Sequence, residues 1–209
     1  MSILYGRHAG ETIIVVGNSS SLNEQNLDLM DAFTTLGLNR ILAFYEPTYY
    51  MAVDQSVMRD EHERINETTA TRLFYPGLMN SKNRILCPGP WVSTGPMTGQ
   101  ADPRAKTGPI HICRGGGNSA YEAVQIAMRM GAVRIALAGV DMYWPPGHPS
   151  HCFGSGAAVG CKLPYPDKKI EDFALLKKQY ARGGIEMCSV SPWDTPFRKV
   201  MGYTPLEDL

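Results

Sequence analysis

The chain has 209 residues, a length that suits one α/β domain with a sizeable core. Its 20 basic and 20 acidic residues balance, so the composition as a whole indicates neither a nucleic-acid surface nor a membrane surface. No apolar run approaches the roughly 20 residues of a membrane span. The five cysteines are scattered without a C-x-x-C pair, and no signal-peptide core stands at the start. We therefore expect a single domain over residues 1–209, with reduced thiols and a cytoplasmic location. The low charge and the aromatic content also permit a homo-oligomer.

The first strong pattern is an apolar run over residues 13–16 that stops at Gly17 and is followed by Asn18 and three serines. It predicts a buried strand, a tight turn and a helix that begins near Leu22. Glycine lets the backbone approach a ligand closely, and the free N–H groups of a helix start favour an anion. The turn therefore indicates a phosphate or nucleotide site formed by Gly17, Asn18, Ser19 and Ser21. The alternative is a plain helix cap, and neither a P-loop nor a G-x-G-x-x-G motif is present.

The next part of the chain alternates between helix and strand patterns. Its expected elements are a helix at Asn26–Leu36 ended by Gly37, a strand at Arg40–Tyr45, a helix from Tyr49 to about Asn66, and short strands at Leu73–Tyr75 and Arg84–Cys87.

The second half repeats the opening pattern with a glycine-rich turn. Its expected elements are a strand at 110–114, a turn at 115–119, a helix at Ala120–Met130, a strand at Val133–Gly139, a helix at Lys168–Arg182, a strand at Ile185–Val190 and an irregular tail.

This alternation predicts a parallel sheet flanked by helices on both faces. Ligands of such sheets bind beyond the carboxyl ends of the strands. Four segments should share that edge: Gly17–Ser21, Tyr45–Thr48, 115–119 and Asp141–Tyr143. A long loop to about Pro166, carrying His148 and His151, leaves from the same edge.

Several of these motifs together resemble a known group. The turn at 15–22 is similar to the G-N-G-P-S-L turn of bacterial CMP-sialic-acid-dependent sialyltransferases, and to a related turn in archaeal 6-hydroxymethylpterin diphosphokinase-like proteins. Residues 44–48 resemble the F-Y-N-P-S segment of the sialyltransferases, and residues 150–154 resemble their S-H-Y-I-G. The strongest similarity is the serine-bearing turn, small-residue helix and G-I-D-like strand end over 117–143. The resemblance covers most of 12–190 and implies a Rossmann-like nucleotide-binding domain that performs transfer chemistry.

The chain departs from the sialyltransferase pattern at two functional positions. Ser155 stands where those enzymes carry the histidine that acts as general base, and Glu46 stands where they carry a nucleotide-binding asparagine. The resemblance places Glu46 at the donor site, and the shared edge of the predicted sheet adds Asn118, Ser119 and Tyr143. Asn118 and Ser119 would clamp a diphosphate or ribose, and the Tyr143 hydroxyl would donate to a phosphate. The alternatives are a glycine turn that only redirects the chain and a half-buried aromatic residue at the edge of the sheet.

His151 and His148 are the candidate general bases, because an imidazole titrates near neutrality and can take a proton from an acceptor hydroxyl. Asp141 would bind Mg²⁺ or accept a hydrogen bond from a ligand hydroxyl. The alternatives are loop histidines without a role and an aspartate that anchors the loop. His151, Cys152 and Cys161 fit no common zinc spacing, so we expect no structural metal site.

The sequence thus favours a glycosyltransferase that uses a nucleotide-sugar donor and an acceptor not identified by the residues. His151 or His148 would deprotonate the acceptor while the two turns hold the diphosphate. One rival is an ATP- and Mg²⁺-dependent diphosphokinase-like enzyme with Asp141 and Glu46 as metal ligands. Another is a non-catalytic nucleotide-binding module that has lost its base at Ser155.

Overall fold

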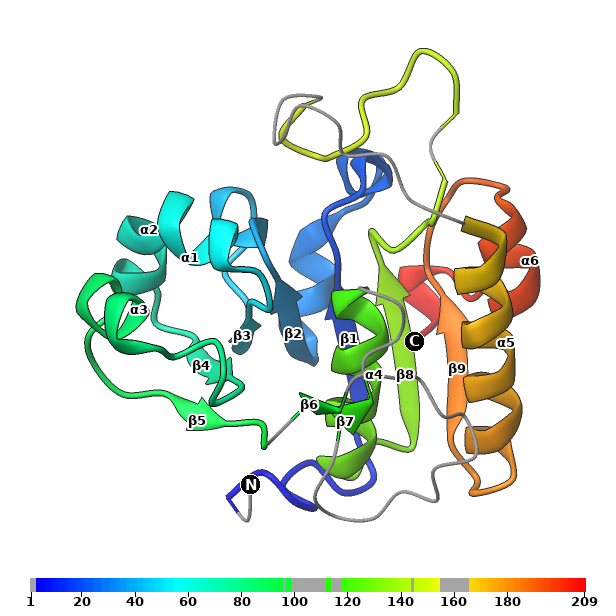
Figure 1. Ribbon diagram of the computed structural model, residues 1–209. Coiled ribbons are helices and arrows are strands. Elements are labelled where there is room, and N and C mark those ends of the chain that lie inside the picture. Colours follow the sequence, from blue (N-terminus) through cyan, green and yellow to red (C-terminus); the bar gives the residue numbers. More distant parts are fainter. Residues whose placement is uncertain (1–2, 96, 99–111, 114–117, 144, 155–165) are drawn as a thin grey trace.

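The computed structural model describes residues 3–95, 97–98, 112–113, 118–143, 145–154 and 166–209. Its centre is a seven-stranded sheet in the order β5-β4-β3-β2-β1-β8-β9, and every pairing in it is parallel (Figure 1). Its strands are β1 (Thr12–Val16), β2 (Thr34–Leu38), β3 (Tyr49–Met51), β4 (Thr71–Phe74), β5 (Val92–Ser93), β8 (Arg134–Ala138) and β9 (Glu186–Ser189). A separate parallel pair joins β6 (Met97–Thr98) to β7 (Ile112–Cys113).

Helices connect these strands. The α-helices are α1 (Gln55–Asp60), α2 (His62–Glu67), α3 (Ser81–Leu86), α4 (Ser119–Arg129), α5 (Pro166–Ala181) and α6 (Pro196–Met201). The 3-10 helices are η1 (Ser20–Glu24), η2 (Leu27–Ala32), η3 (Ile41–Ala43) and η4 (Leu206–Asp208). None of the described helices is both long and apolar enough to cross a membrane.

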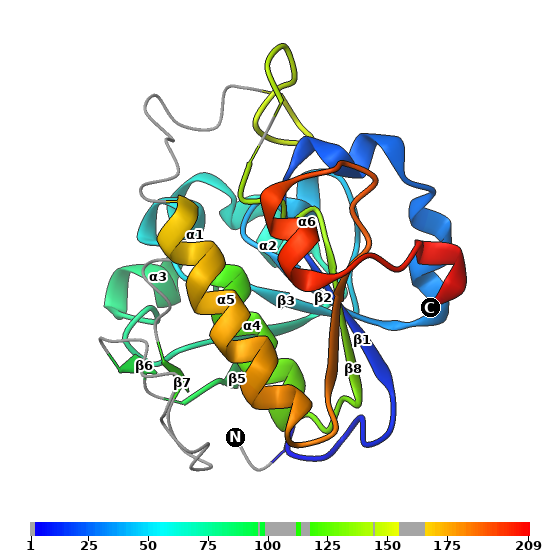
Figure 2. The ribbon, with the colours of Figure 1, turned by 90° about the vertical axis from the view of Figure 1, so that its right-hand side faces the viewer.

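Alternate residues of β1, β3, β8 and β9 enter two hydrophobic cores, because successive side chains of a strand point to opposite faces. In β1, Ile13 and Val15 pack under α4, α5 and α6, whereas Ile14 and Val16 pack under the 3-10 helices and α1 to α3. Figure 2 shows α4 and α5 together on one side of the sheet. All four residues are fully buried, which explains why the run has no polar alternation. The expected parallel sheet with helices on both faces is therefore confirmed.

The strand order reverses at β1, which pairs with β2 on one side and with β8 on the other. A reversal of this kind opens a crevice at the carboxyl ends of the strands, where parallel α/β sheets bind ligands. Gly17 follows β1 there, and a Cβ atom on it would lie 2.2 Å from the carbonyl oxygen of Gly139. Glycine is thus required by the close approach of two backbones, rather than by a positive φ.

Between residues 26 and 66 the expected helices and strands differ from the observed ones in type and in position. The segment expected to be one helix contains η2 and then β2, and the expected strand at Arg40–Tyr45 is instead the short η3. Tyr49–Met51, expected to begin a helix, form β3 instead, and the helical part begins only with α1. Farther along, the expected strand at Arg84–Cys87 falls within and just after α3, and the tail contains α6.

The strongest patterns are confirmed with small shifts in their bounds. These are β1, β4, β8, β9, α4 and α5. The expected strand at 110–114 is seen as β7, which is the part of it that the structure describes. The glycine turn at 115–117 lies outside the described residues.

Candidate functional site

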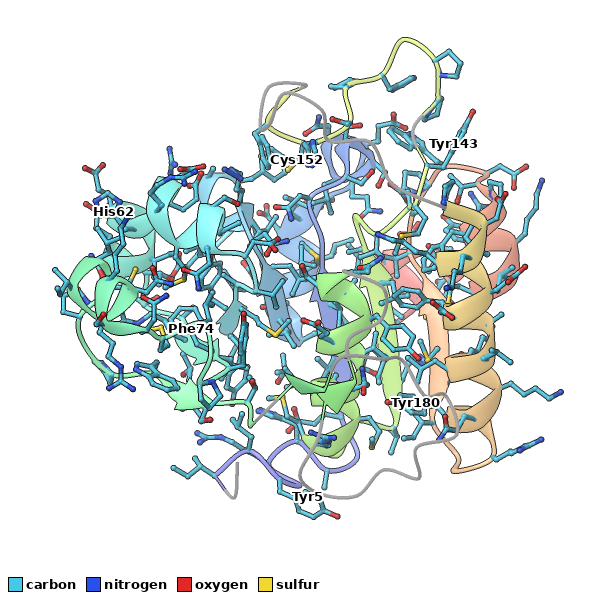
Figure 3. All side chains as sticks on the ribbon, in the orientation of Figure 1. Tyr5, His62, Phe74, Tyr143, Cys152 and Tyr180 are labelled. Carbon is cyan, nitrogen blue, oxygen red and sulfur yellow. The ribbon has the colours of Figure 1, made fainter. Side chains whose placement is uncertain are left out.

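The turn after β1 is covered by the loop 145–154. The backbone N–H of Cys152 donates to the carbonyl oxygen of Asn18 at 2.9 Å, and the Ser20 hydroxyl donates to the carbonyl oxygen of Pro149. Figure 3 shows Cys152 and Tyr143 at the same edge of the molecule, with Tyr5 at the opposite edge. The structure therefore brings the turn and the histidine loop together at the carboxyl edge, as the sequence predicts.

Asn39 belongs to the candidate site, and the sequence analysis did not predict it. It follows β2 directly, with a φ of 53°, a left-handed conformation that asparagine tolerates better than most residues. Its Nδ2 donates to the Ser119 hydroxyl at 2.9 Å, and its carbonyl oxygen accepts from the Tyr50 hydroxyl at 2.6 Å. The Asn18 Nδ2 donates to the carbonyl oxygen of Leu38, one residue earlier, at 3.0 Å. Asn18, Asn39 and Ser119 thus form one cluster across the ends of β1 and β2 and the start of α4.

Asn118 caps α4 in the ordinary way. Its Oδ1 accepts from the backbone N–H of Ala120 at 2.9 Å, while its Nδ2 lies 3.0 Å from the sulfur of Met142. The side chain of Asn118 therefore joins the start of α4 to the segment after β8.

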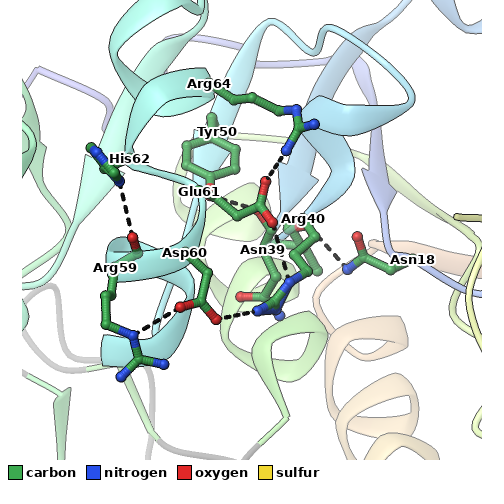
Figure 4. Close-up of polar contacts among 10 residues, drawn as sticks. Asn18, Asn39, Arg40, Tyr50, Arg59, Asp60, Glu61, His62 and Arg64 are labelled. Carbon is green, nitrogen blue, oxygen red and sulfur yellow. Dashed lines mark hydrogen bonds and ion pairs between the residues drawn. The ribbon is translucent and has the colours of Figure 1, made fainter. Parts of the chain in front are cut away.

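Arg40, next to Asn39, is held in an ion-pair network (Figure 4). Its Nη2 lies 2.7 Å from Asp60 Oδ2, and its Nε lies 3.3 Å from Glu61 Oε1. Arg64 pairs with the other oxygen of Glu61 at 2.7 Å. These pairs fasten the segment after β2 to the junction of α1 and α2, so Asn39 stands on a rigid support.

His151 combines features expected of a general base. Its Nδ1 lies 2.7 Å from the Ser150 hydroxyl, and its ring stacks on Phe153 with 5.1 Å between centroids. Burial lowers the pKa of His151 below its usual range, and the positive charge of Arg40 lowers it further. The imidazole is therefore neutral at pH 7 and able to accept a proton.

His148 occupies a different environment in the same loop. Its ring meets Trp193 edge to face at 5.0 Å, and the Trp193 indole N–H donates to Glu24 Oε1 at 2.8 Å. His148 thus packs toward the segment after β9. His151 precedes Cys152, whose N–H donates to Asn18 of the β1 turn, and the charge of Arg40 acts on its pKa.

Asp141 is buried, with 1% of its surface exposed. Burial raises its pKa, and the nearby hydroxyls of Ser19, Ser191 and Ser21 oppose that rise only in part. Neither carboxylate oxygen has a well-formed hydrogen bond within the described residues. Asp141 therefore lies beneath the turn, between the segments that follow β1 and β9.

Glu46 does not lie at the carboxyl edge, and its expected place there is wrong. The Tyr45–Thr48 segment precedes β3 and so belongs to the amino edge of the sheet. There, Glu46 Oε1 accepts a hydrogen bond from the Thr68 hydroxyl at 2.5 Å and another from the backbone N–H of Thr69 at 2.8 Å. Burial raises the pKa of Glu46, but these hydrogen bonds outweigh it and bring the pKa below its ordinary value. Glu46 anchors the entry to β4, and Asp54 follows β3 at the carboxyl edge instead.

Tyr143, Ser155 and a possible metal site are the remaining candidates from the sequence. Tyr143 is 43% exposed at the carboxyl edge, where its hydroxyl can reach a ligand. Ser155 lies outside the described residues. Within the described part of the chain, no group of three or more His, Cys, Asp or Glu side chains is placed to hold a metal ion.

The sequence matches no family model and none of the curated proteins. The fold resembles that of a sialyltransferase of known structure. CstII from Campylobacter jejuni in complex with cytidine-5'-monophosphate matches with a TM-score of 0.57 and 14% identity, over 96% of this chain and 88% of that chain. The same enzyme with the substrate analogue CMP-3FNeuAc gives a TM-score of 0.54 at 12% identity, over 95% of this chain and 88% of that chain. A point mutant of the α-2,3/8-sialyltransferase CstII gives 0.53 at 12% identity, over 95% and 89%. At these identities the likeness establishes the shared fold.

Proposed function

We propose that the protein is a glycosyltransferase that uses a nucleotide-sugar donor, with a cytidine nucleotide as the first candidate. The observation that carries the proposal is the position of His151. The loop 145–154 is fastened to the β1 turn at Asn18 and Ser20, and this supports a role for the His151 imidazole, whose pKa is lowered by burial, at the switch point of the sheet. The donor is suggested by the cytidine ligands of the sialyltransferase that shares the fold.

In this proposal His151 is the general base, and Ser150 orients it. With the Ser150 hydroxyl accepting from Nδ1–H, the lone pair of Nε2 takes the proton of the acceptor hydroxyl. The acceptor oxygen then displaces the nucleotide from the sugar, and the bond between the sugar and the phosphate oxygen breaks. The Ser119 hydroxyl and the Tyr143 hydroxyl are the donors proposed to stabilise the leaving phosphate.

The donor is tested by the thermal melting of the protein with CMP-, UDP- and GDP-sugars, and with ATP plus Mg²⁺. A ligand present at about 100 times its Kd stabilises the folded state by ~2.7 kcal/mol, which is easily measured as a rise in Tm. We expect the largest rise with the CMP-sugar. A rise with ATP plus Mg²⁺ alone would instead favour the diphosphokinase-like alternative.

The base is tested by His151→Ala in a transfer assay with the donor that binds. Turnover should fall by ~10²- to 10⁴-fold, the usual contribution of a positioned general base, while donor affinity stays within a few fold. The matched control is His62→Ala, because His62 is a half-buried histidine on α2 whose Nδ1 contacts only the carbonyl oxygen of Arg59 in the described residues. Full turnover in His151→Ala would show that this imidazole is not the base, and loss in His148→Ala would move the role to His148. Binding without any transfer would identify a nucleotide-binding module.

A further inference from the structure

Met142 has a backbone conformation that methionine rarely adopts. Its φ is 53°, in the left-handed region, and among the described residues other than glycine only Asn39 shares this property. A long side chain is strained in this region, and such strain persists where the surrounding structure holds the residue in place. Met142 and Asp141 before it are buried, whereas Tyr143 after it is exposed at the carboxyl edge of the sheet. The strained residue is therefore the point at which the chain turns outward.

The side chain of Asn118 holds Met142 from the neighbouring element. Its Nδ2 donates to the Met142 sulfur at 3.0 Å, and its Oδ1 accepts from the backbone N–H of Ala120 at 2.9 Å. The contact with Ala120 requires an acceptor, so it fixes which end of the amide faces the sulfur. The amide of Asn118 thus uses its oxygen to cap α4 and its nitrogen to hold the segment after β8.

Each partner of this hydrogen bond is followed directly by a hydroxyl that we propose to stabilise the leaving phosphate. Ser119 follows Asn118 at the start of α4, and Tyr143 follows Met142. The Ser119 hydroxyl accepts from the Asn39 Nδ2 at 2.9 Å, so its own proton remains available for an anion. The two hydroxyls belong to different elements, and a functional pair of this kind must keep its geometry to within about 0.5 Å.

We propose that Asn118 and Met142 form a positioning clamp, which sets the spacing of the Ser119 and Tyr143 hydroxyls and so fixes the phosphate of the donor. The clamp rests on the proposed nucleotide-sugar site. Its two residues act on the donor only through the hydroxyls beside them. The left-handed turn at Met142 directs Tyr143 outward, and the amide of Asn118 keeps that turn in place.

The test removes the hydrogen bond from each side in turn. Asn118→Ser keeps a helix cap, because serine caps a helix about as well as asparagine, but its shorter side chain does not reach the sulfur. Met142→Leu removes the sulfur and keeps the volume of the side chain. The matched control is Met128→Leu, the same exchange near the other end of α4.

The first measurement is a calorimetric titration of CMP and of cytidine, which lacks the phosphate. In the parent protein and in Met128→Leu, CMP should bind at least ~10-fold more tightly than cytidine, because hydrogen bonds to a charged group are strong. In Asn118→Ser and Met142→Leu this ratio should fall at least ~3-fold, while the affinity for cytidine stays within ~2-fold. Damage to the fold would instead weaken both ligands alike.

The second measurement is the turnover of the CMP-sugar. In both clamp variants kcat should fall ~10-fold or more with the KM of the acceptor unchanged, because the phosphate gains charge as it leaves. The double variant Asn118→Ser/Met142→Leu should be no slower than the slower single variant, since both changes remove one hydrogen bond. When Tyr143→Phe has already removed the hydroxyl, Met142→Leu should lower kcat less than ~2-fold further.

Three results would overturn the clamp while the donor site stands. One is a ratio of CMP to cytidine affinity that neither variant changes, and another is an additive loss of kcat from Met142→Leu and Tyr143→Phe. The third is a parent protein that binds CMP no more tightly than cytidine. A parent protein that binds neither ligand overturns the proposed cytidine donor site and the clamp with it. Melting curves show that each variant is folded, and Met142→Leu decides the outcome if Asn118→Ser unfolds.

Discussion

At the scale of single residues, burial favours the neutral form of both His151 and Asp141, so it moves their pKa values in opposite directions. For His151 the consequence is a base that stays unprotonated in mildly acidic solution.

The acid limb of the pH profile of kcat/KM should therefore lie below pH ~6.5, the ordinary pKa of histidine. Arg40→Met removes the positive charge and should move that limb to higher pH, whereas Arg59→Met, which removes an exposed partner of Asp60, should not. A pH profile of kcat/KM for the three proteins checks this, and a limb above pH ~6.5 in the parent contradicts it.

Asp141 gives a second prediction, on stability. Its folded-state pKa is raised, so the folded state binds its proton more tightly than the unfolded state does, and stability is lost as the pH rises through the folded pKa. Asp141→Asn removes that ionisation. The Tm of the variant should equal or exceed that of the parent at pH 7, and the difference should shrink as the pH falls toward ~4, the ordinary range of aspartate. A variant that is clearly less stable at pH 7 would show that the carboxylate is instead stabilised by Ser19, Ser21 and Ser191.

At the scale of elements, the junction of β1 with β8 depends on Gly17. Any side chain there meets the carbonyl oxygen of Gly139, which belongs to the backbone and cannot rotate away. Gly17→Ala should therefore lower the free energy of unfolding by several kcal/mol, within the range of overpacked core positions, and Gly17→Val should not fold. Urea unfolding measures the change. Gly183→Ala is the control, because the nearest atom to its added Cβ lies 3.4 Å away. Near-parent stability in Gly17→Ala would show that the two strands can separate at little cost.

The sequence reading succeeded where one pattern covers a whole element, and failed where short elements follow each other. The continuous apolar runs of β1 and β8 and the long α4 and α5 were all predicted. Gly37 was read as the end of a helix, but it lies inside β2, where the absence of a Cβ leaves room for Pro47 and Ile41. That one misread element shifted the next strand along the chain. Glu46 was thereby placed at the wrong edge of the sheet, and Asn39 was hidden within an expected connection.

At the scale of the whole molecule, the candidate site is assembled from segments that are far apart in the chain. The turn after β1, the end of β2, the start of α4 and the loop 145–154 meet at one edge because all strands of the main sheet run in the same direction. Each segment alone reads as a cap, a turn or a surface loop. Pairing such as Cys152 with Asn18 depends on the strand order, and a single sequence does not reveal that order.

The strand order also has a consequence for synthesis on the ribosome. β1 is synthesised before β8, yet one of its two edges pairs with β8, so Ile13 has no partner on that edge until Ile135 has been made. Until residues 134–138 emerge, an apolar strand in the middle of the future sheet has an unpaired edge, the kind of surface that promotes aggregation. Contacts so distant in sequence form slowly. The nascent protein should therefore need a chaperone most while its first half is already outside the ribosome and its central strand is still incomplete.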